Sequence, residues 1–285
     1  MSRPALAFLA PSPQGPIGPV AAVLGLTLLA YLGVGIASGA VWQAGSTLDG
    51  AGAQGALRLA MSLAPFAAGL GMLWAASGAL MPDERRRMWS VAGRLRWREV
   101  GLGAACWSLL VVGPGLAGAL ISGEAPTPLA WLSAWRGPDI ALVLGVGLVG
   151  FAAQTLAEEA LFRGFLLRQS ARLGWRPAAL VALNAALFGA IHWPGGAELM
   201  AFAGLSGAVF ATVTLARGGI EAAWGGHLVQ NLAAGVVLFG PLAAPEPALG
   251  WTDWALAIAS LGAFTAAMVW TRPRGAPSAA RPDPA

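Results

Sequence analysis

Long apolar runs, separated by short segments containing polar, proline or glycine residues, dominate the sequence. Eight of these runs approach the roughly 20 residues that an α-helix needs to cross a bilayer. They lie at about 20–37, 57–81, 100–121, 139–161, 177–193, 198–216, 221–241 and 251–271. The strands of a membrane barrel would alternate apolar and polar positions, which these runs do not. The pattern predicts an all-α, polytopic membrane helical bundle of about eight transmembrane helices.

The composition also indicates a membrane protein rather than a soluble domain. Of 285 residues, 57% are hydrophobic and 11% are charged, and the mean hydropathy is +0.67. The 40 glycines suit close packing between membrane helices. We interpret Gly145-x-Gly147-x-x-Gly150 in this way, because no strand precedes it as a dinucleotide-binding loop requires. The single Cys106 excludes an internal disulfide and a multi-cysteine metal site.

The distribution of arginine predicts the orientation of the bundle. The chain contains no lysine, so arginines carry all 17 basic charges. Eight spans with both termini cytoplasmic place fifteen of these 17 arginines inside and only Arg58 and Arg136 outside. The segments 39–56, 122–138 and 242–250 would then lie outside. We expect an integral protein of a bacterial plasma membrane whose arginines face anionic lipid. No basic stripe interleaved with aromatic residues indicates a nucleic-acid partner.

Three regions follow from this pattern. Residues 1–19, with five prolines, are expected to form an irregular cytoplasmic tail. Residues 20–271 form the transmembrane domain. Residues 272–285, rich in proline, alanine and arginine, are expected to be a disordered cytoplasmic tail.

Charged side chains interrupt one of the apolar runs, between Ala157 and Phe165. Glu158, Glu159 and Arg163 stand there among apolar neighbours. Ionisable groups inside a membrane are energetically expensive, and they commonly mark a functional site. On a helix, Glu159 and Arg163 share a face and can pair, whereas Glu158 points about 100° away. A purely structural ion pair with a spare carboxylate is the alternative interpretation.

The only two histidines occur in later apolar runs. His192 follows Phe188 by four residues, and Asn231 follows His227 by four. On helices, these spacings place His227 and Asn231 on one face and allow the Phe188 ring to orient His192. A lone intramembrane histidine is often a hydrogen-bonded packing residue. Two histidines, an asparagine and a glutamate pair indicate a functional group of residues.

Taken together, these residues form a specific pattern. Glu158-Glu159-x-x-x-Arg163, Phe188-x-x-x-His192 and His227-x-x-x-Asn231 occur in this order on three hydrophobic helices. They resemble the motifs of the CPBP family of intramembrane proteases. That family includes the type II CAAX prenyl endopeptidases and bacteriocin-processing or self-immunity (Abi) proteins. The resemblance covers about 145–245, and it implies endopeptidase chemistry in which the first motif's glutamate activates water.

The side chains themselves suit peptide hydrolysis, which requires a base, donors for the developing oxyanion and an acid for the leaving amine. We expect Glu158 to be the base and His192 to orient the water. We expect His227 and Asn231 to form the oxyanion site. Glu159 and Arg163 would hold the first motif in place.

Three alternatives remain open. A zinc protease could use Glu158, His192 and His227 as ligands, although the local HExxH signature is absent. We therefore expect no cofactor, with zinc as the alternative. A proton-coupled transporter could use the glutamates and histidines as a relay. A catalytically silent immunity or partner protein could keep the fold without the activity.

The depth of the motif residues imposes a further condition. His192 lies 16 residues after Arg176, which places it farther from the cytoplasmic end than Glu158. We therefore expect the fourth helix to extend to about Arg168 and the fifth to begin below the hydrocarbon boundary. A water-filled cavity inside the bundle would open towards the cytoplasm. The expected substrate is a membrane-associated peptide, either lipidated or amphipathic.

Overall fold

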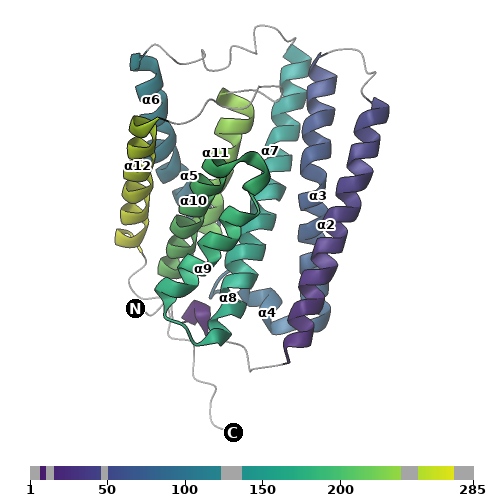
Figure 1. Ribbon diagram of the computed structural model, residues 1–285, viewed down its shortest axis with the longest axis vertical. Coiled ribbons are helices and arrows are strands. Elements are labelled where there is room, and N and C mark those ends of the chain that lie inside the picture. Colours follow the sequence, from purple (N-terminus) through teal and green to yellow (C-terminus); the bar gives the residue numbers. More distant parts are fainter. Residues whose placement is uncertain (1–6, 11–15, 46–50, 123–136, 239–249, 273–285) are drawn as a thin grey trace.

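The computed structural model describes residues 7–10, 16–45, 51–122, 137–238 and 250–272. These residues form a bundle of helices that contains no strand, apart from an isolated bridge between Ser90 and Gly219 (Figure 1). The all-α class predicted from the apolar runs is confirmed.

Long helices of similar direction make up most of the bundle. They are α2 (Ile17–Gly45), α3 (Ala51–Leu80), α5 (Trp97–Trp107), α6 (Gly113–Ser122), α7 (Gly137–Glu159), α9 (Pro177–Ala190), α10 (Ala197–Arg217), α11 (Glu221–Leu232) and α12 (Trp251–Trp270). Short helices are α4 (Pro82–Arg87) and α8 (Leu167–Ser170), with 3-10 turns η4 (Ala171–Leu173) and η5 (Trp193–Gly195). Three π-helical segments continue longer helices: η1 (Ser108–Val112), η3 (Ala160–Leu166) and η6 (Ala233–Leu238).

All eight apolar runs contain a helix, but their lengths differ. Six helical segments of the described chain are long and apolar enough to cross a membrane. The α9 helix has only 14 residues, and α11 is not among the six. A count of eight spans therefore remains a prediction.

The first two helices extend beyond the apolar runs from which we predict the spans. Residues 39–45 continue α2 and residues 51–56 already belong to α3, so most of the segment 39–56, which we predict to lie outside the membrane, is helical. Hydropathy identifies the part of a helix inside the hydrocarbon, whereas the hydrogen-bonded helix can continue beyond it. Residues 123–136, 239–249 and 273–285, which include most of the other predicted outer segments and the carboxyl tail, lie outside the described residues.

The amino-terminal segment 1–19 also differs from the irregular tail that we expected. Residues 7–9 form a helical turn, and α2 begins at Ile17. Phe8 and Leu9 are buried among apolar side chains. The carbonyl of Phe8 accepts a hydrogen bond from Arg168, whose guanidinium lies 5.3 Å from the Phe8 ring centroid. The contacts with Arg168 therefore hold Phe8 against the bundle, although the segment around it is rich in proline.

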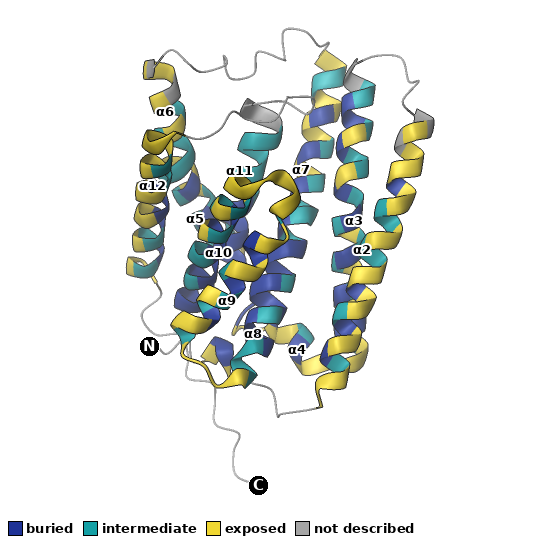
Figure 2. Cartoon of the chain, in the orientation of Figure 1, coloured by how far each residue is buried: buried dark blue, intermediate teal, exposed yellow. Residues whose placement is uncertain are grey.

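The helices pack in a defined order. The α3 helix lies between α2 and α7, α7 packs against α11, and α11 packs against α5, whereas α10 contacts both α9 and α12. Apolar side chains on the outer faces remain exposed, as Figure 2 shows for α2 and α12. Ile36, Val149 and Leu109, for example, are 77%, 71% and 73% exposed. This outward apolar surface fits a hydrocarbon solvent.

The α5 and α11 helices approach each other at backbone distance. A side-chain carbon at Gly103 would lie within 3.0 Å of the Ala222 carbonyl, and one at Gly225 would meet the Val100 carbonyl equally closely. Small residues allow such contacts between membrane helices. The glycines thereby fix the height of α11, which carries His227, relative to α5.

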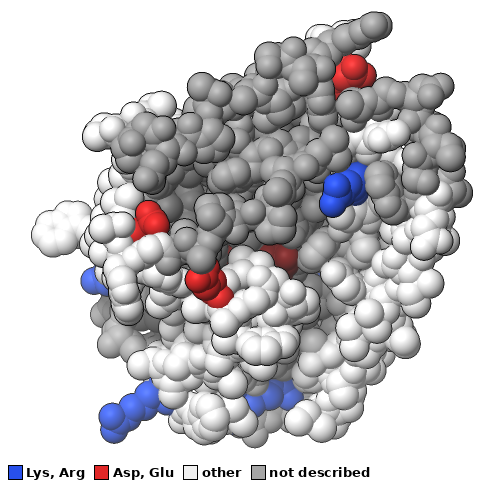
Figure 3. Space-filling view, turned by 45° about the horizontal axis from the view of Figure 1, so that its top comes forward, with Lys and Arg blue, Asp and Glu red and all other residues white. Residues whose placement is uncertain are grey.

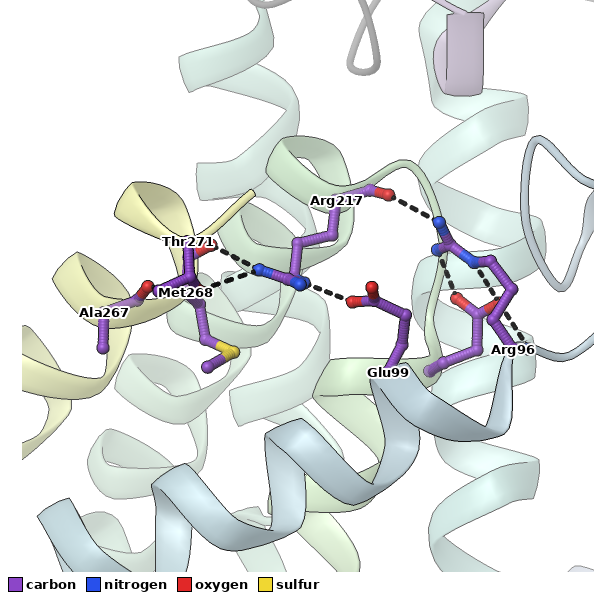
Figure 4. A network of polar contacts seen from close by, with 7 residues as sticks. Arg96, Glu99, Arg217, Ala267, Met268 and Thr271 are labelled. Carbon is purple, nitrogen blue, oxygen red and sulfur yellow. Dashed lines mark hydrogen bonds and ion pairs between the residues drawn. The ribbon is translucent and has the colours of Figure 1, made fainter. Parts of the chain in front are cut away.

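A polar network joins α5, α10, α11 and α12 at the lower end of the bundle (Figure 4). Arg96 and Glu221 form an ion pair of 2.7 Å, and Arg96 also donates to the Arg217 carbonyl at 3.1 Å. Arg217 pairs with Glu99 and donates to the Met268 carbonyl at 2.9 Å. Burial lowers the pKa of Arg96, but the hydrogen bond and charge of Glu221 outweigh it and raise that pKa above its usual value. The network therefore holds the first turn of α11.

Several arginines that we expected to face lipid are instead internal. Arg96 and Arg217 belong to the network, Arg168 pairs with Glu84 at 3.1 Å, and Arg163 is completely buried. Only part of the arginine charge is therefore available to lipid.

Candidate active site

The first motif lies where an α-helix widens into a π-helix. Glu158 and Glu159 end α7, and η3 begins at the next residue. Widened turns of this kind often occur at functional sites. The side-chain amide of Asn184 donates to the Phe162 carbonyl at 2.6 Å, which satisfies a backbone group within the widened turn. The helix then continues through α8 to Ser170, as the depth argument predicted.

Glu159 is the centre of a buried ionic group. Its Oε1 accepts from Arg163 Nη1 at 3.0 Å, which confirms the expected helical pair, and lies 2.9 Å from His227 Nδ1. Glu159 and Arg163 have no exposed surface, and His227 is 4% exposed. The Glu159 carboxylate therefore joins the first and third motifs directly.

Arg163 is held by aromatic rings as well as by its ion pair. Its guanidinium carbon lies 4.1 Å from the centroid of Phe188, 5.6 Å from that of Phe210 and 5.9 Å from that of Phe162. Among the residues that the structure describes, its Nε and Nη2 groups have no hydrogen-bond partner. The faces of the rings therefore supply much of the stabilisation that this buried cation needs.

His227 lies between the two glutamates. While Nδ1 faces Glu159, Nε2 lies 3.4 Å from Glu158 Oε2. The imidazole stacks on Phe210 at 5.2 Å, with an interplanar angle of 24°. These contacts fix the ring so that its second nitrogen is directed at Glu158. We had expected His227 to be an oxyanion donor, but both of its nitrogens face carboxylates.

Gln154 is a member of the cluster that sequence reasoning missed. Its Nε2 donates to Glu158 Oε1 at 3.3 Å, and its Oε1 accepts from Asn231 Nδ2 at 3.4 Å. Gln154 therefore connects Asn231 to Glu158. A signal was available, because Gln154 is a polar residue in an apolar run and precedes Glu158 by four positions. Phe210 offered no such signal, since it is one apolar residue among many.

His192 enters the group through Phe188. It lies between the end of α9 and the start of η5, where it is the N-cap residue of η5, and its Nδ1 lies 2.7 Å from the Phe188 carbonyl. The Phe188 ring lies 4.7 Å from the His192 ring and 5.9 Å from the His227 ring. The short α9 helix thus brings His192 to the depth of the other motif residues.

The side chains of the cluster differ in burial between its lower and upper sides. Gln154 and Asn231, each one helical turn from Glu158 and His227 along α7 and α11, are half-buried, whereas Glu159 and Arg163 are fully buried. In Figure 3, carboxylate atoms lie deep in the middle of the upper face. Two surface hollows of the described chain are lined by residues outside the cluster. The less buried side of the cluster thus faces away from the arginine-rich end, so the predicted water-filled cavity with a cytoplasmic opening has no support in this geometry and stays a prediction.

The described residues hold no group of three or more His, Cys, Asp and Glu side chains arranged to bind a metal ion. Of the ligands in the zinc alternative, His227 already has both ring nitrogens against carboxylates, and Nδ1 of His192 faces a backbone carbonyl. Metal binding at Glu158, His192 and His227 would require these side chains to rearrange. We therefore derive the chemistry from the side chains alone.

An apolar helical bundle with a glutamate, histidine and asparagine cluster between its helices is typical of an integral membrane protein with a buried polar site. Comparison with known families is more specific. Residues 140–233 match the family model described as type II CAAX prenyl endopeptidase Rce1-like. All seven residues named in the three motifs lie within this segment, and the resemblance to CPBP proteases is confirmed.

One relative is the uncharacterized protein YyaK of Bacillus subtilis (strain 168). It is 25% identical over 170 residues, which make up 56% of this chain and 54% of the relative. The matched region thus spans about half the length of that protein. No solved structure matches the chain.

Proposed function

We propose that this protein is a glutamate-dependent intramembrane endopeptidase. The observation that carries the proposal is the buried arrangement in which His227 lies between Glu158, at 3.4 Å, and Glu159, at 2.9 Å. A carboxylate next to an oriented imidazole can accept a proton from water and pass it on. The Rce1-like match supports protease activity independently of this geometry.

In the proposed reaction, Glu158 removes a proton from a water molecule, and the hydroxide adds to the peptide carbonyl. Glu158 Oε2 suits this role, since among the described residues it accepts no hydrogen bond and its only ionic neighbour is His227 Nε2 at 3.4 Å. His192, the less buried histidine, orients the water. The tetrahedral intermediate collapses when the proton is delivered to the leaving amine, which restores the Glu158 carboxylate.

The remaining side chains position these groups. Glu159 holds the proton of His227 on Nδ1, so that Nε2 faces Glu158 and shares its proton. Arg163 in turn fixes Glu159. The Asn231 amide supplies a donor for the oxyanion once substrate displaces its 3.4 Å contact with Gln154. In this scheme His227 is a proton partner of Glu158 rather than an oxyanion donor.

The proposed substrate is a membrane-associated peptide, either lipidated or amphipathic. The cluster lies between apolar helices, so the scissile bond must be carried by a segment that partitions into the bilayer. The description of the matching family, which names a prenyl endopeptidase, supports the same class of substrate. Prenylation itself is not required by this reasoning.

The test uses purified protein in detergent and two fluorogenic peptides of one sequence, with and without a lipid anchor. We expect much faster cleavage of the anchored peptide and at least about a 100-fold loss in Glu158→Gln, which lacks the base. Asp139→Asn is the matched control, because it removes a carboxylate from the first turn of the same helix. Full turnover by Glu158→Gln would exclude the assignment of the base.

The same preparation tests the zinc alternative. We expect activity to survive chelation. One zinc per chain, with activity lost on chelation and restored by zinc, would instead support a metalloprotease that uses the same residues. Proton flux into liposomes without cleavage would support the transporter alternative, and absence of both activities would support a silent partner.

A further inference from the structure

A hollow rich in arginine and tryptophan lies at the lower end of the bundle, away from the motif residues. Its volume is about 560 Å³. The residues that matter for the argument are Trp74, Arg85, Arg86, Trp89, Arg94 and Trp97. No acidic side chain lines it. The hollow therefore concentrates positive charge beside aromatic rings.

The hollow lies at a membrane boundary. The candidate spans Ala53–Leu80 and Trp97–Gly118 are joined by the segment that supplies its arginines. Trp74 belongs to the last turns of one span, and Trp97 begins the next. Both indoles are exposed, at 40% and 67%. Tryptophan prefers this level of the bilayer, where headgroups meet the acyl chains.

Within the described part of the chain, Arg85, Arg86 and Arg94 differ from the internal arginines of the lower end in having no acidic partner. Arg96, Arg168 and Arg217 each form an ion pair with a glutamate. Among the described residues, none of the ion pairs involves Arg85, Arg86 or Arg94. The unbalanced guanidinium groups therefore favour an anionic ligand.

Arg85 is held in place for such a ligand. Its guanidinium carbon lies 4.7 Å from the Trp74 ring centroid, and the Trp74 and Trp89 rings are 5.3 Å apart. A side-chain carbon at Gly78 would lie 2.6 Å from Arg85 Nη1, so glycine leaves the space that the guanidinium occupies. The buried Nε of Arg85 has no hydrogen-bond partner within the described part of the chain. Stacked guanidinium groups bind phosphate through paired hydrogen bonds.

We propose that this hollow binds the phosphate headgroup of an anionic phospholipid, with the acyl chains along the exposed apolar faces of the two spans. Basic pockets between membrane helices suit such headgroups. A soluble phosphate would satisfy the arginines but would make no use of the exposed Trp74 and Trp97 or of the neighbouring Leu80, which is 44% exposed. The position at the membrane boundary therefore favours the lipid.

The bound lipid would also stabilise the segment beneath the catalytic helices. The Trp89 carbonyl accepts a hydrogen bond of 3.0 Å from the Ile220 amide, directly before α11. Met88 packs closely against Gly164 in η3. A ligand that fixes Trp89 thus raises the stability of contacts to both η3 and α11.

Native mass spectrometry of the purified protein tests the proposal without measuring proteolysis, so its outcome is independent of the proposed function. The probes are phosphatidylglycerol and phosphatidylcholine with identical acyl chains. We expect selective retention of phosphatidylglycerol, weakened about fivefold for each arginine removed in Arg86→Gln and Arg94→Gln. Both arginines are exposed, so folding should be preserved. Arg85→Gln should weaken retention as well.

Arg87→Gln is the matched control, because Arg87 is exposed on α4 but does not line the hollow. It should retain phosphatidylglycerol as the wild type does. Equal retention of both lipids by the wild type, or equal loss in Arg87→Gln, would overturn the proposal. Displacement of the lipid by excess inorganic phosphate would also overturn it, since the site would then bind free anions. The wild type with phosphatidylglycerol should show a higher Tm than with phosphatidylcholine.

Discussion

At the scale of single residues, Glu159 and Arg163 depend on each other. Both side chains are completely buried, and Glu159 also holds His227. Removing one partner of a buried ion pair leaves a charge without compensation, which typically destabilises a protein by about 3–5 kcal/mol. The aromatic rings around Arg163 reduce this penalty without removing it.

We predict that Glu159→Gln lowers the Tm markedly and reduces activity, since Arg163 loses its charge partner and His227 loses its orientation. Thermal unfolding in detergent measures the first effect. The double variant Glu159→Gln with Arg163→Met should be more stable than Glu159→Gln alone, because no charge is stranded. If the double variant were the less stable of the two, the pair would not be coupled as described.

Local spacing determined which of these contacts could be predicted. The Glu159 to Arg163 pair follows from the helical repeat, and Gln154 could have been included by the same rule. The contact between His227 and Glu159 joins residues 68 positions apart, so it depends on how α7 and α11 pack. Sequence indicated that both residues matter, but it could not show which nitrogen faces which carboxylate.

At the scale of elements, apolar length predicted where helices occur but not how they end or pack. The π-helical turn at Ala160–Leu166 has no signature in hydropathy, because it changes the hydrogen-bond register without changing composition. The backbone contact between α5 and α11 was likewise only suggested by the abundance of glycine. Both features determine the position of the catalytic groups.

We predict that Gly103→Ala destabilises the protein and lowers activity, because the new methyl group would overlap the Ala222 carbonyl and displace α11 with His227. Overpacking of this kind typically costs about 1–3 kcal/mol. Gly101→Ala on the same helix is the control, since no atom lies within 4 Å of the added carbon. Measurements of Tm and peptide cleavage should separate the two variants. Equal behaviour would show that α5 does not set the position of α11.

At the scale of the whole molecule, the structure brings the arginine-bearing connections together at one end. The segment around Arg96, the turn after Arg217 and the end of α12 meet in one network, and Arg168 joins α4 nearby (Figures 1 and 4). The predicted topology requires these arginine-rich connections to lie on the same face of the membrane, and they do lie at the same end of the bundle. Which face it is, the cytoplasmic or the outer, follows only from the positive-inside rule.

Cysteine labelling in intact cells tests that orientation. In a Cys106→Ala background, Ala92→Cys marks the arginine-rich end and Thr252→Cys marks the opposite end, and both positions are exposed. We expect an impermeant maleimide to modify Thr252→Cys in intact cells, because the arginine-poor end should face outward. Ala92→Cys should react only after lysis, since fifteen of the 17 arginines would lie on the cytoplasmic side. Labelling of Ala92→Cys without lysis would reverse the topology, and with it the leaflet that supplies both the proposed substrate and the lipid.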